Sequence, residues 1–340
     1  MASERESDEE AVARTSGFGA EPAGEADRRL RARLAGAGLP LLLDGATGTE
    51  LERAGVRTGL PLWSTHALLE APEQVRAIHA AYARVGAEIL TANTFRTQRR
   101  TLARAGLDDR DEALTRLAVA LARDAARQRP GEAAWVAGSL PPLEDCYRSD
   151  LVPDEASLER EHGRQAELLA GSGVDLVLIE TMGSVREACA AARAVSRTDR
   201  PFVVSFVSWR PGVLLSGEAL ATAARAVLDL GALAVGVNCV PGRTLHASRC
   251  ALEPLDAALL VSPNLGQPDD ETGFRRDEEV TAEAFTQLVE PWLDGATRLV
   301  GGCCGTTPAH IAALARRLAR APGPPSSAPA PGRADEPARD

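Results

Sequence analysis

The chain contains no lysine: all 38 of its basic residues other than histidine are arginine. Together with an excess of alanine, this absence indicates a bias in codon usage rather than a functional requirement. The arginines form no basic stripe along the sequence, and the formal net charge is −10. We therefore expect neither nucleic acid nor an anionic membrane as a partner.

Long apolar runs and an export signal are also absent. No run is long enough to cross a bilayer, and the opening residues, MASERESDEEAVARTSG, are charged and lack the apolar segment of a secretion signal. We expect a cytoplasmic protein. Its six cysteines are then thiols, core residues or metal ligands before they are disulfides.

The two ends of the chain have compositions that cannot bury a core. Residues 1–27 are acidic and polar, and residues 321–340 are rich in proline, alanine and serine. We expect both segments to be disordered tails. Residues 28–320 are expected to form a single domain.

A short apolar run followed by a loop and an amphipathic stretch recurs through the body of the chain. Near-continuous apolar runs between helices are typical of parallel strands that are covered on both sides. Eight such units predict an α/β fold of the (β/α)₈ TIM-barrel type. The predicted strands are 39–45, 87–93, 133–139, 174–180, 201–207, 232–239, 258–264 and 297–304. The predicted helices are 72–85, 110–128, 155–171, 184–195, 217–229, 281–292 and 308–319.

The alternative architecture is an open, doubly wound sheet. The turn after the first predicted strand lacks the Gly-x-Gly-x-x-Gly pattern of a dinucleotide-binding sheet, so we favour the barrel. Residues 140–153, LPPLEDCYRSDLVP, form a long loop after the third strand. This loop is a candidate lid or wall of a site.

Catalytic residues of a (β/α)₈ barrel gather at the carboxyl ends of its strands. Three of the six cysteines end the sixth and eighth predicted strands, which only one strand separates, so these three thiols can converge at the barrel mouth. The residues at the predicted strand ends are Asp44, Asn93, Ser139, Glu180, Ser208, Cys239, Asn264 and the pair Cys303 and Cys304.

Three converging thiolates suit zinc, and they leave open the fourth tetrahedral position that a catalytic zinc site requires. Adjacent cysteines reach one ion only if the backbone turns sharply, and Gly301, Gly302 and Gly305 supply that freedom. Two other interpretations remain open: a buried, incidental set of small side chains, or a disulfide between the adjacent pair. The remaining cysteines, at positions 146, 189 and 250, are interpreted as structural.

Three motifs resemble the homocysteine S-methyltransferase family: DGATGTEL (44–51), VNC (237–239) and GGCCGTTPAHI (301–311). The resemblance spans about residues 39–319. It implies a homocysteine-binding (β/α)₈ barrel with one zinc ion per chain on Cys239, Cys303 and Cys304. The implied reaction is methyl transfer to the thiolate of homocysteine, which gives methionine.

The resemblance also implies holders for the amino-acid end of homocysteine. Glu180, in IETM, corresponds to the family's ammonium-binding glutamate, although a strand-end carboxylate can also be an ordinary cap. The peptide N–H groups of Gly45, Ala46 and Thr47 are candidates for cradling the carboxylate. Asp44 either presents its carbonyl to the ammonium group or braces the turn. Asn238 is expected to support Cys239 from behind.

The motifs identify residues for binding the methyl donor less clearly than residues for the metal and for homocysteine. Trp63 matches a tryptophan near the mouth in relatives and could offer a cation–π face, or it packs in the core. Asn93 is expected to face the mouth. Arg96 stands where members that use betaine carry an aromatic residue, which argues against betaine, and it could hold a donor carboxylate. Residues 140–153 also depart from the pattern of enzymes that use S-methylmethionine.

The expected donor is nevertheless a sulfonium, S-methylmethionine or S-adenosylmethionine. Methylfolate is not expected, because no folate or cobalamin domain follows the barrel, and without a long C-terminal arm a monomer is expected. Three alternatives stay open: another thiol or selenol acceptor such as selenocysteine, a homocysteine-binding module that works with a separate methyl-carrier protein, and a barrel with redox-active cysteines.

Overall fold

The computed structural model describes residues 23–36, 38–269, 273–276 and 280–320. Eight parallel strands form one sheet in the order β1-β10-β7-β6-β5-β4-β3-β2. A parallel bridge between Leu43 and Ile89 joins the first and last strands of that order and closes the barrel. The strands are β1 (Leu41–Leu42), β2 (Ile89–Ala92), β3 (Trp135–Leu140), β4 (Leu176–Met182), β5 (Phe202–Phe206), β6 (Val235–Asn238), β7 (Leu259–Ser262) and β10 (Thr297–Val300). The predicted (β/α)₈ barrel is confirmed.

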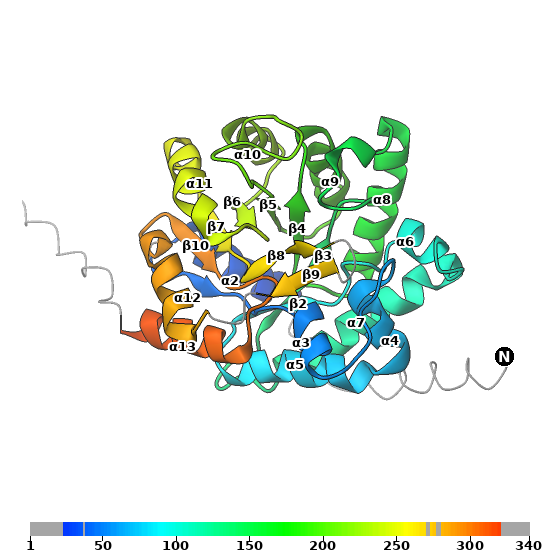
Figure 1. Ribbon diagram of the computed structural model, residues 1–340, viewed down its shortest axis with the longest axis horizontal. Helices are drawn as coiled ribbons and strands as arrows, with labels where there is room; N and C mark the ends of the chain where they lie inside the picture. The colour runs from blue at the N-terminus through cyan, green and yellow to red at the C-terminus, as the bar shows by residue number, and fades with distance from the viewer. Residues whose placement is uncertain (1–22, 37, 270–272, 277–279, 321–340) are drawn as a thin grey trace, which may run out of the picture.

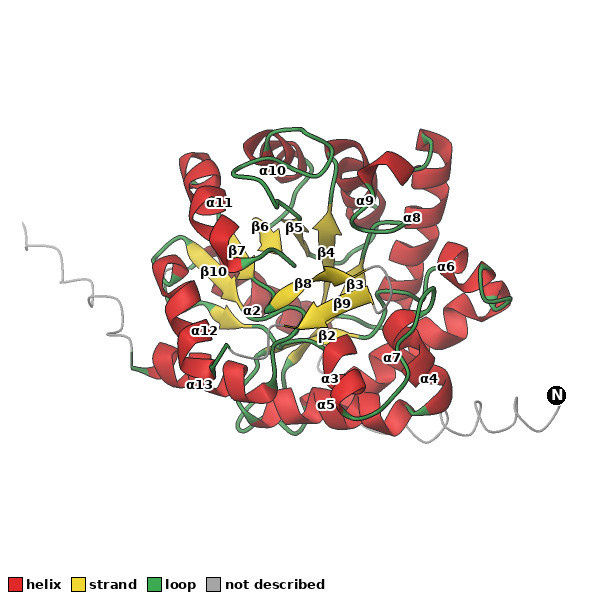
Figure 2. Ribbon diagram, viewed as in Figure 1, coloured by secondary structure: helices red, strands yellow, loops and turns green. Residues whose placement is uncertain are grey.

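Helices surround the ring of strands (Figures 1 and 2). Each of the seven predicted helical stretches overlaps one observed α-helix, and only α9 extends past its stretch, by one residue. These helices are α5 (Pro72–Arg84), α7 (Asp111–Ala126), α8 (Glu155–Gly171), α9 (Val185–Ser196), α10 (Leu220–Asp229), α12 (Ala282–Val289) and α13 (Pro308–Ala319). The short helices α3 (Gly48–Arg53), α4 (His66–Glu70), α6 (Arg99–Ala103) and α11 (Leu245–Leu252) were not predicted. Among the described residues, no helix is both long and apolar enough to cross a membrane.

Helix α2 (Ala23–Ala35) covers the amino-terminal end of the barrel. Its residues Leu30 and Leu34 are buried in the cluster of side chains that fills the barrel interior. Arg33 pairs with Glu88, directly before β2, at 3.0 Å. The helix begins inside the range 1–27 that was expected to be a tail, because its apolar face has the barrel interior to pack against. Residues 1–22 and 321–340 lie outside the described residues.

An antiparallel hairpin, β8 (Gly266–Asp269) and β9 (Gly273–Arg276), follows β7 and was not predicted. Figure 1 shows it crossing the ring of strands in gold. Its sequence, GQPDDETGFRR, has no apolar alternation, which is why the pattern indicated only a loop. The hairpin begins at the carboxyl end of β7, on the same side of the barrel as the candidate site.

Candidate metal centre and substrate pocket

A cavity of about 580 Å³ opens at the carboxyl ends of the strands. All twelve predicted site residues line it: Asp44, Gly45, Ala46, Thr47, Trp63, Asn93, Arg96, Glu180, Asn238, Cys239, Cys303 and Cys304. Within the described ranges, four residues other than glycine have a positive φ, and three of them line this cavity: Trp63 (48°), Thr181 (63°) and Cys239 (52°). Strained backbone of this kind concentrates at functional sites.

The three thiols meet at one point of the cavity wall. The Sγ atom of Cys239 lies 3.1 Å from that of Cys303 and 3.8 Å from that of Cys304, and all three sulfurs fall within 4.8 Å of one another. Cys239 follows β6 directly, and its left-handed backbone is held by a hydrogen bond from its N–H to the carbonyl of Ser262 at 3.1 Å. The cluster is a candidate three-cysteine metal site, and all six cysteines are free.

The thiols share their protons unequally. Hydrogen bonds from Cys303 and Cys304 hold the pKa of the Cys239 thiol well below its ordinary value. The same bonds to Cys239 raise the pKa values of Cys303 and Cys304 well above theirs. Thiols this close together suit a cation, because a bound metal ion stabilises deprotonated sulfur.

The glycines around the cysteine pair serve close packing more than conformational freedom. A Cβ on Gly301 would lie 2.5 Å from the Cβ of Leu43, and one on Gly302 would lie 2.4 Å from Thr306 Oγ1. Of these three glycines, only Gly305 has a positive φ, +86°. A Cβ there would also lie 2.3 Å from the carbonyl oxygen of Leu265. The expected role as a flexible turn therefore applies to Gly305 alone.

Gly305→Ala is expected to weaken metal binding about tenfold or more while the barrel stays folded. The added Cβ must displace the backbone of Leu265, whose N–H binds the carbonyl of Cys304 at 2.8 Å. Gly131→Ala is the matched control: Gly131 has the same φ of +86° but nothing within 4 Å of an added Cβ. Both variants should lose about 1 kcal/mol of stability to backbone strain.

The measurement for this pair is competition with a chelator, alongside thermal unfolding. If both variants bind metal as tightly as the parent, the close approach at Gly305 has no bearing on the thiol geometry.

Glu180 lies on β4 at the floor of the cavity. Ser139 donates a hydrogen bond to its Oε1, and the Nδ2 of Asn238 donates to its Oε2 at 3.1 Å. Burial, opposed by the hydrogen bond from Ser139 and assisted by the charges of Cys239 and Asp44, raises the pKa of Glu180 to about 8. In the described structure no cation pairs with this carboxyl group, so it is prepared for a cationic ligand.

Asn238 is committed to Glu180 and its surroundings rather than to Cys239. Its Oδ1 accepts hydrogen bonds from the N–H of Thr181 and the hydroxyl of Ser205, each at 2.8 Å. Its Nδ2 donates to Glu180 and to Thr181 Oγ1. We expected Asn238 to support Cys239; instead its side chain fixes the orientation of the carboxyl group, because it points inward from β6 while Cys239 is turned aside by its left-handed backbone.

The DGATG turn is tied to the cysteine loop by hydrogen bonds. The carbonyl of Asp44 accepts from the N–H of Gly302 at 3.1 Å, and the N–H of Ala46 donates to Thr306 Oγ1 at 3.2 Å. The Asp44 carboxylate accepts from both the N–H and the hydroxyl of Thr91, and burial raises its pKa to about 7. Asp44 thus braces the turn, which is one of the two roles considered for it.

The three residues assigned to the donor side all line the cavity, with different partners. The indole of Trp63 packs on Gly48, where an added Cβ would lie 2.4 Å from its Nε1. The amide of Asn93 is fully engaged by Ser64, at 2.5 and 3.0 Å, so it holds the loop that carries Trp63. Arg96 is buried, and its guanidinium has few partners.

Two aromatic residues were missed. The hydroxyl of Tyr147 lies 3.3 Å from Cys239 Sγ, and its ring stacks on Trp209 with 4.9 Å between centroids. The Trp209 indole donates to the carbonyl of Cys239 at 3.4 Å. Tyr147 comes from residues 140–153, so this loop is a wall of the cavity. The sequence offered two signals: an aromatic residue in the loop 140–153, and a tryptophan three residues after the end of β5.

Comparison with known proteins agrees with this geometry. The family model for homocysteine S-methyltransferase matches residues 41–318. The selenocysteine methyltransferase of Astragalus bisulcatus is 30% identical over 326 residues, covering 86% of this chain and 96% of that protein. The homocysteine S-methyltransferase of Escherichia coli (strain K12) is 33% identical over 302 residues, covering 82% and 94%.

A solved structure gives the same result in three dimensions. The homocysteine methyltransferase MmuM from Escherichia coli, in its metallated form, matches with a TM-score of 0.71 and 31% sequence identity, covering 82% of this chain and 96% of that one. The family match spans most of the chain and includes the cysteines and the glutamate that line the cavity. The protein belongs to the homocysteine S-methyltransferase family.

Proposed function

We propose that the protein is a zinc-dependent enzyme that transfers a methyl group from a sulfonium donor, S-methylmethionine or S-adenosylmethionine, to homocysteine and so forms methionine. The observation that carries this proposal is the convergence of three thiols and a half-buried carboxyl group without a cationic partner in one described cavity. The thiols supply a metal site, and the carboxyl group supplies a binding site for an ammonium group.

The residues present fit zinc. Three cysteine sulfurs within 4.8 Å of one another match the soft, tetrahedral ligand set that zinc prefers, with one position left for a further ligand. Bound there, zinc would accept the substrate sulfur as its fourth ligand and lower the pKa of that thiol, which makes it nucleophilic near neutral pH.

The protein's own residues position the acceptor. Ionised Glu180 holds the ammonium group of homocysteine, and Asn238 and Ser139 keep its two oxygens in place. The N–H groups of Gly45 and Thr47 are candidates for the carboxylate, whereas that of Ala46 is already donated to Thr306. Holding both ends of the amino acid fixes where its sulfur lies, and such positioning supplies much of the rate in a displacement reaction.

The transfer balances without a further reactant. The bond from the donor sulfur to the methyl carbon breaks as the bond from the homocysteine sulfur to that carbon forms. The electron pair of the broken bond stays on the donor, which leaves as a neutral thioether, and the thiol proton passes to solvent. The anionic sulfur cluster attracts the cationic donor into line, an electrostatic contribution that strengthens in a buried site.

The direct test is methionine formation by the purified, zinc-loaded protein from homocysteine with S-methylmethionine, S-adenosylmethionine or betaine. We expect methionine from at least one sulfonium and none from betaine. Absence of methionine with every donor, in protein that has bound zinc, would overturn the proposal and direct attention to a separate methyl-carrier protein.

Methionine affinity is expected to rise with pH up to about pH 8 and to fall again once the ammonium group of methionine itself loses its proton. Binding of its ammonium group needs the ionised form of Glu180, whose pKa is about 8, so affinity should fall about tenfold per pH unit below that value. Methionine is the suitable probe because its thioether does not titrate. Calorimetry on the parent and on Glu180→Gln checks this, since the variant should bind weakly with little pH dependence. The same slope in both proteins would assign the titration to another group.

Selenocysteine is a second candidate acceptor. Two relatives of 30% identity are named as selenocysteine methyltransferases, one from Astragalus bisulcatus and one from Brassica oleracea var. italica. Glu180 and the DGATG turn suit any amino-acid acceptor, so they do not discriminate the two. A competition assay with both acceptors present, scored by the methylated product, gives the ratio of their kcat/KM values.

A further inference from the structure

Arg96 carries a buried positive charge that the protein leaves largely uncompensated. Arg96 is 8% exposed and lines the cavity. The guanidinium makes one long hydrogen bond, from NH1 to the carbonyl of Glu144 at 3.5 Å, and its Nε has no partner in the described structure. It also lies 5.4 Å from the ring of Phe95. Buried charges are ordinarily paired, because burying an unpaired one costs several kcal/mol.

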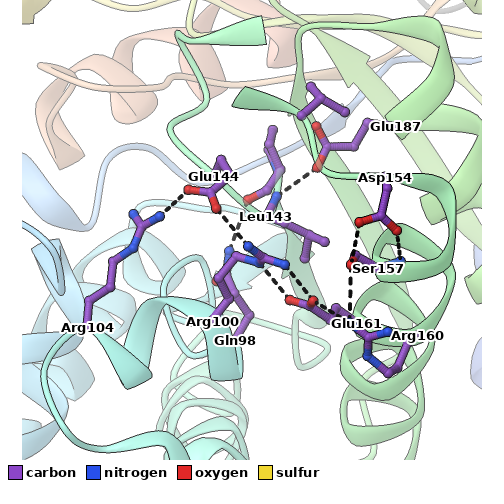
Figure 3. Close-up of polar contacts among 12 residues, drawn as sticks. Gln98, Arg100, Arg104, Leu143, Glu144, Asp154, Ser157, Arg160, Glu161 and Glu187 are labelled. Atoms are coloured by element: carbon purple, nitrogen blue, oxygen red, sulfur yellow. Dashed lines mark hydrogen bonds and ion pairs between the residues drawn. The ribbon is translucent and has the colours of Figure 1, made fainter. Parts of the chain in front are cut away.

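Other arginines bind the carboxylate of Glu144, the residue whose carbonyl accepts the Arg96 hydrogen bond. Figure 3 shows the Glu144 carboxylate between Arg104 and Arg100, with the Arg100 bond at 2.9 Å. Arg100 also binds Glu161 at 2.6 Å. Of Glu144, only the backbone carbonyl is therefore left for Arg96.

The same loop connects this charge with the thiol cluster. Glu144 accepts the hydrogen bond from Arg96, and three residues later Tyr147 contacts Cys239 Sγ. The thiol of Cys146, between them, is influenced by both groups: burial raises its pKa, the Arg96 charge lowers it, and Cys239 raises it. The cavity therefore has a positive group and an anionic sulfur cluster within electrostatic reach of one loop.

We propose that Arg96 binds the carboxylate of the methyl donor and thereby selects amino-acid sulfonium donors. This inference rests on the proposed function. A guanidinium fork pairs with a carboxylate through two parallel hydrogen bonds, and the long contact to Glu144 leaves the fork free to do so. The donor's cationic sulfur then lies toward the thiol cluster, and its carboxylate lies toward Arg96.

The polarity of the cavity also explains why spacing within the donor matters. The methyl-bearing cation of the donor is attracted by the sulfur cluster, so it must lie well apart from a carboxylate that is held by Arg96. Three carbons separate sulfur from the carboxyl group in S-methylmethionine, whereas one carbon separates nitrogen from it in betaine. Betaine held by Arg96 would therefore keep its methyl groups beside the guanidinium and away from the sulfur cluster.

The test compares two donors on three proteins: the parent, Arg96→Gln and Arg148→Gln. Arg148 is the matched control, since it also lines the cavity but is exposed and pairs with Asp150 at 2.7 Å. The donors are S-methylmethionine and trimethylsulfonium, which has no carboxylate. We expect Arg96→Gln to raise the KM for S-methylmethionine about 10- to 100-fold and to abolish most of the parent's preference for it over trimethylsulfonium. Arg148→Gln should keep that preference.

Further measurements separate a binding role from a structural one. Arg96→Lys, which keeps the charge but not the fork, should restore part of the preference. Equal losses with both donors in Arg96→Gln would overturn the inference, and so would a weakened affinity for homocysteine, which would place Arg96 on the acceptor. If the parent itself transfers methyl from neither sulfonium, it is the proposed function that fails.

Discussion

Cys304→Ala is expected to lose its zinc and to lower methyl transfer by more than about 100-fold, with the barrel still folded. The variant would keep only two of the three proposed protein ligands, and the affinity for the metal depends on every ligand. Cys304 is half-buried in a loop beyond β10 and belongs to none of the apolar core clusters. Its removal should therefore leave the free energy of unfolding of the metal-free protein nearly unchanged.

The matched control for this substitution is Cys250→Ala, because Cys250 is an exposed thiol on α11. Zinc content by elemental analysis, methionine formation and thermal unfolding should all be parental in the control. Retention of one zinc per chain and full activity by Cys304→Ala would remove this residue from the ligand set. Loss of activity with zinc retained would assign Cys304 a role other than ligation.

Glu180→Gln is expected to weaken homocysteine binding by about 2 kcal/mol or more, roughly 30-fold, and to leave zinc in place. The glutamine keeps the shape of the side chain but cannot neutralise the ammonium group of the substrate. The proposed zinc ligands come from the ends of β6 and β10, whereas Glu180 is on β4, so we expect the metal site not to depend on it.

Calorimetry with homocysteine, with zinc content measured on the same sample, checks this second prediction. Glu253→Gln is a control on the surface, where the carboxylate is exposed and lies 3.9 Å from Arg249. Parental homocysteine affinity in Glu180→Gln would refute the ammonium-binding role. A simultaneous loss of zinc would show instead that the carboxyl group supports the cysteine loop.

The sequence predicts the positions of the cysteines and of Glu180 well because strand ends of a barrel converge by topology alone. It does not predict which way a side chain turns at a strand end. Asn238 faces Glu180, whereas the neighbouring Cys239 adopts a φ of 52° and turns toward the cysteine pair. That difference depends on the backbone of one residue, and the apolar pattern carries no information about it.

Loop residues and charge compensation are also beyond the pattern. Tyr147 reaches Cys239 only because the loop 140–153 folds back over the cavity. The sequence identifies Arg96 as a departure from betaine-using relatives, but not as a charge without a counterion. Arg100 and Arg104 both bind the Glu144 carboxylate, so it is not available to Arg96. These ion pairs depend on the tertiary structure, and the sequence pattern does not predict them. The β8–β9 hairpin likewise depends on tertiary context.

Helix α2 has a consequence for the order of events in turnover. Leu30 and Leu34 pack into the amino-terminal end of the barrel interior, whereas the described cavity opens at the carboxyl ends of the strands. Under the proposed function, acceptor and donor therefore both enter, and both products leave, at the carboxyl ends of the strands. A shared opening predicts ordered binding: the substrate that binds deeper must bind first, and its product must leave last. An excess of the substrate that binds nearer the opening should then obstruct the cavity and slow turnover.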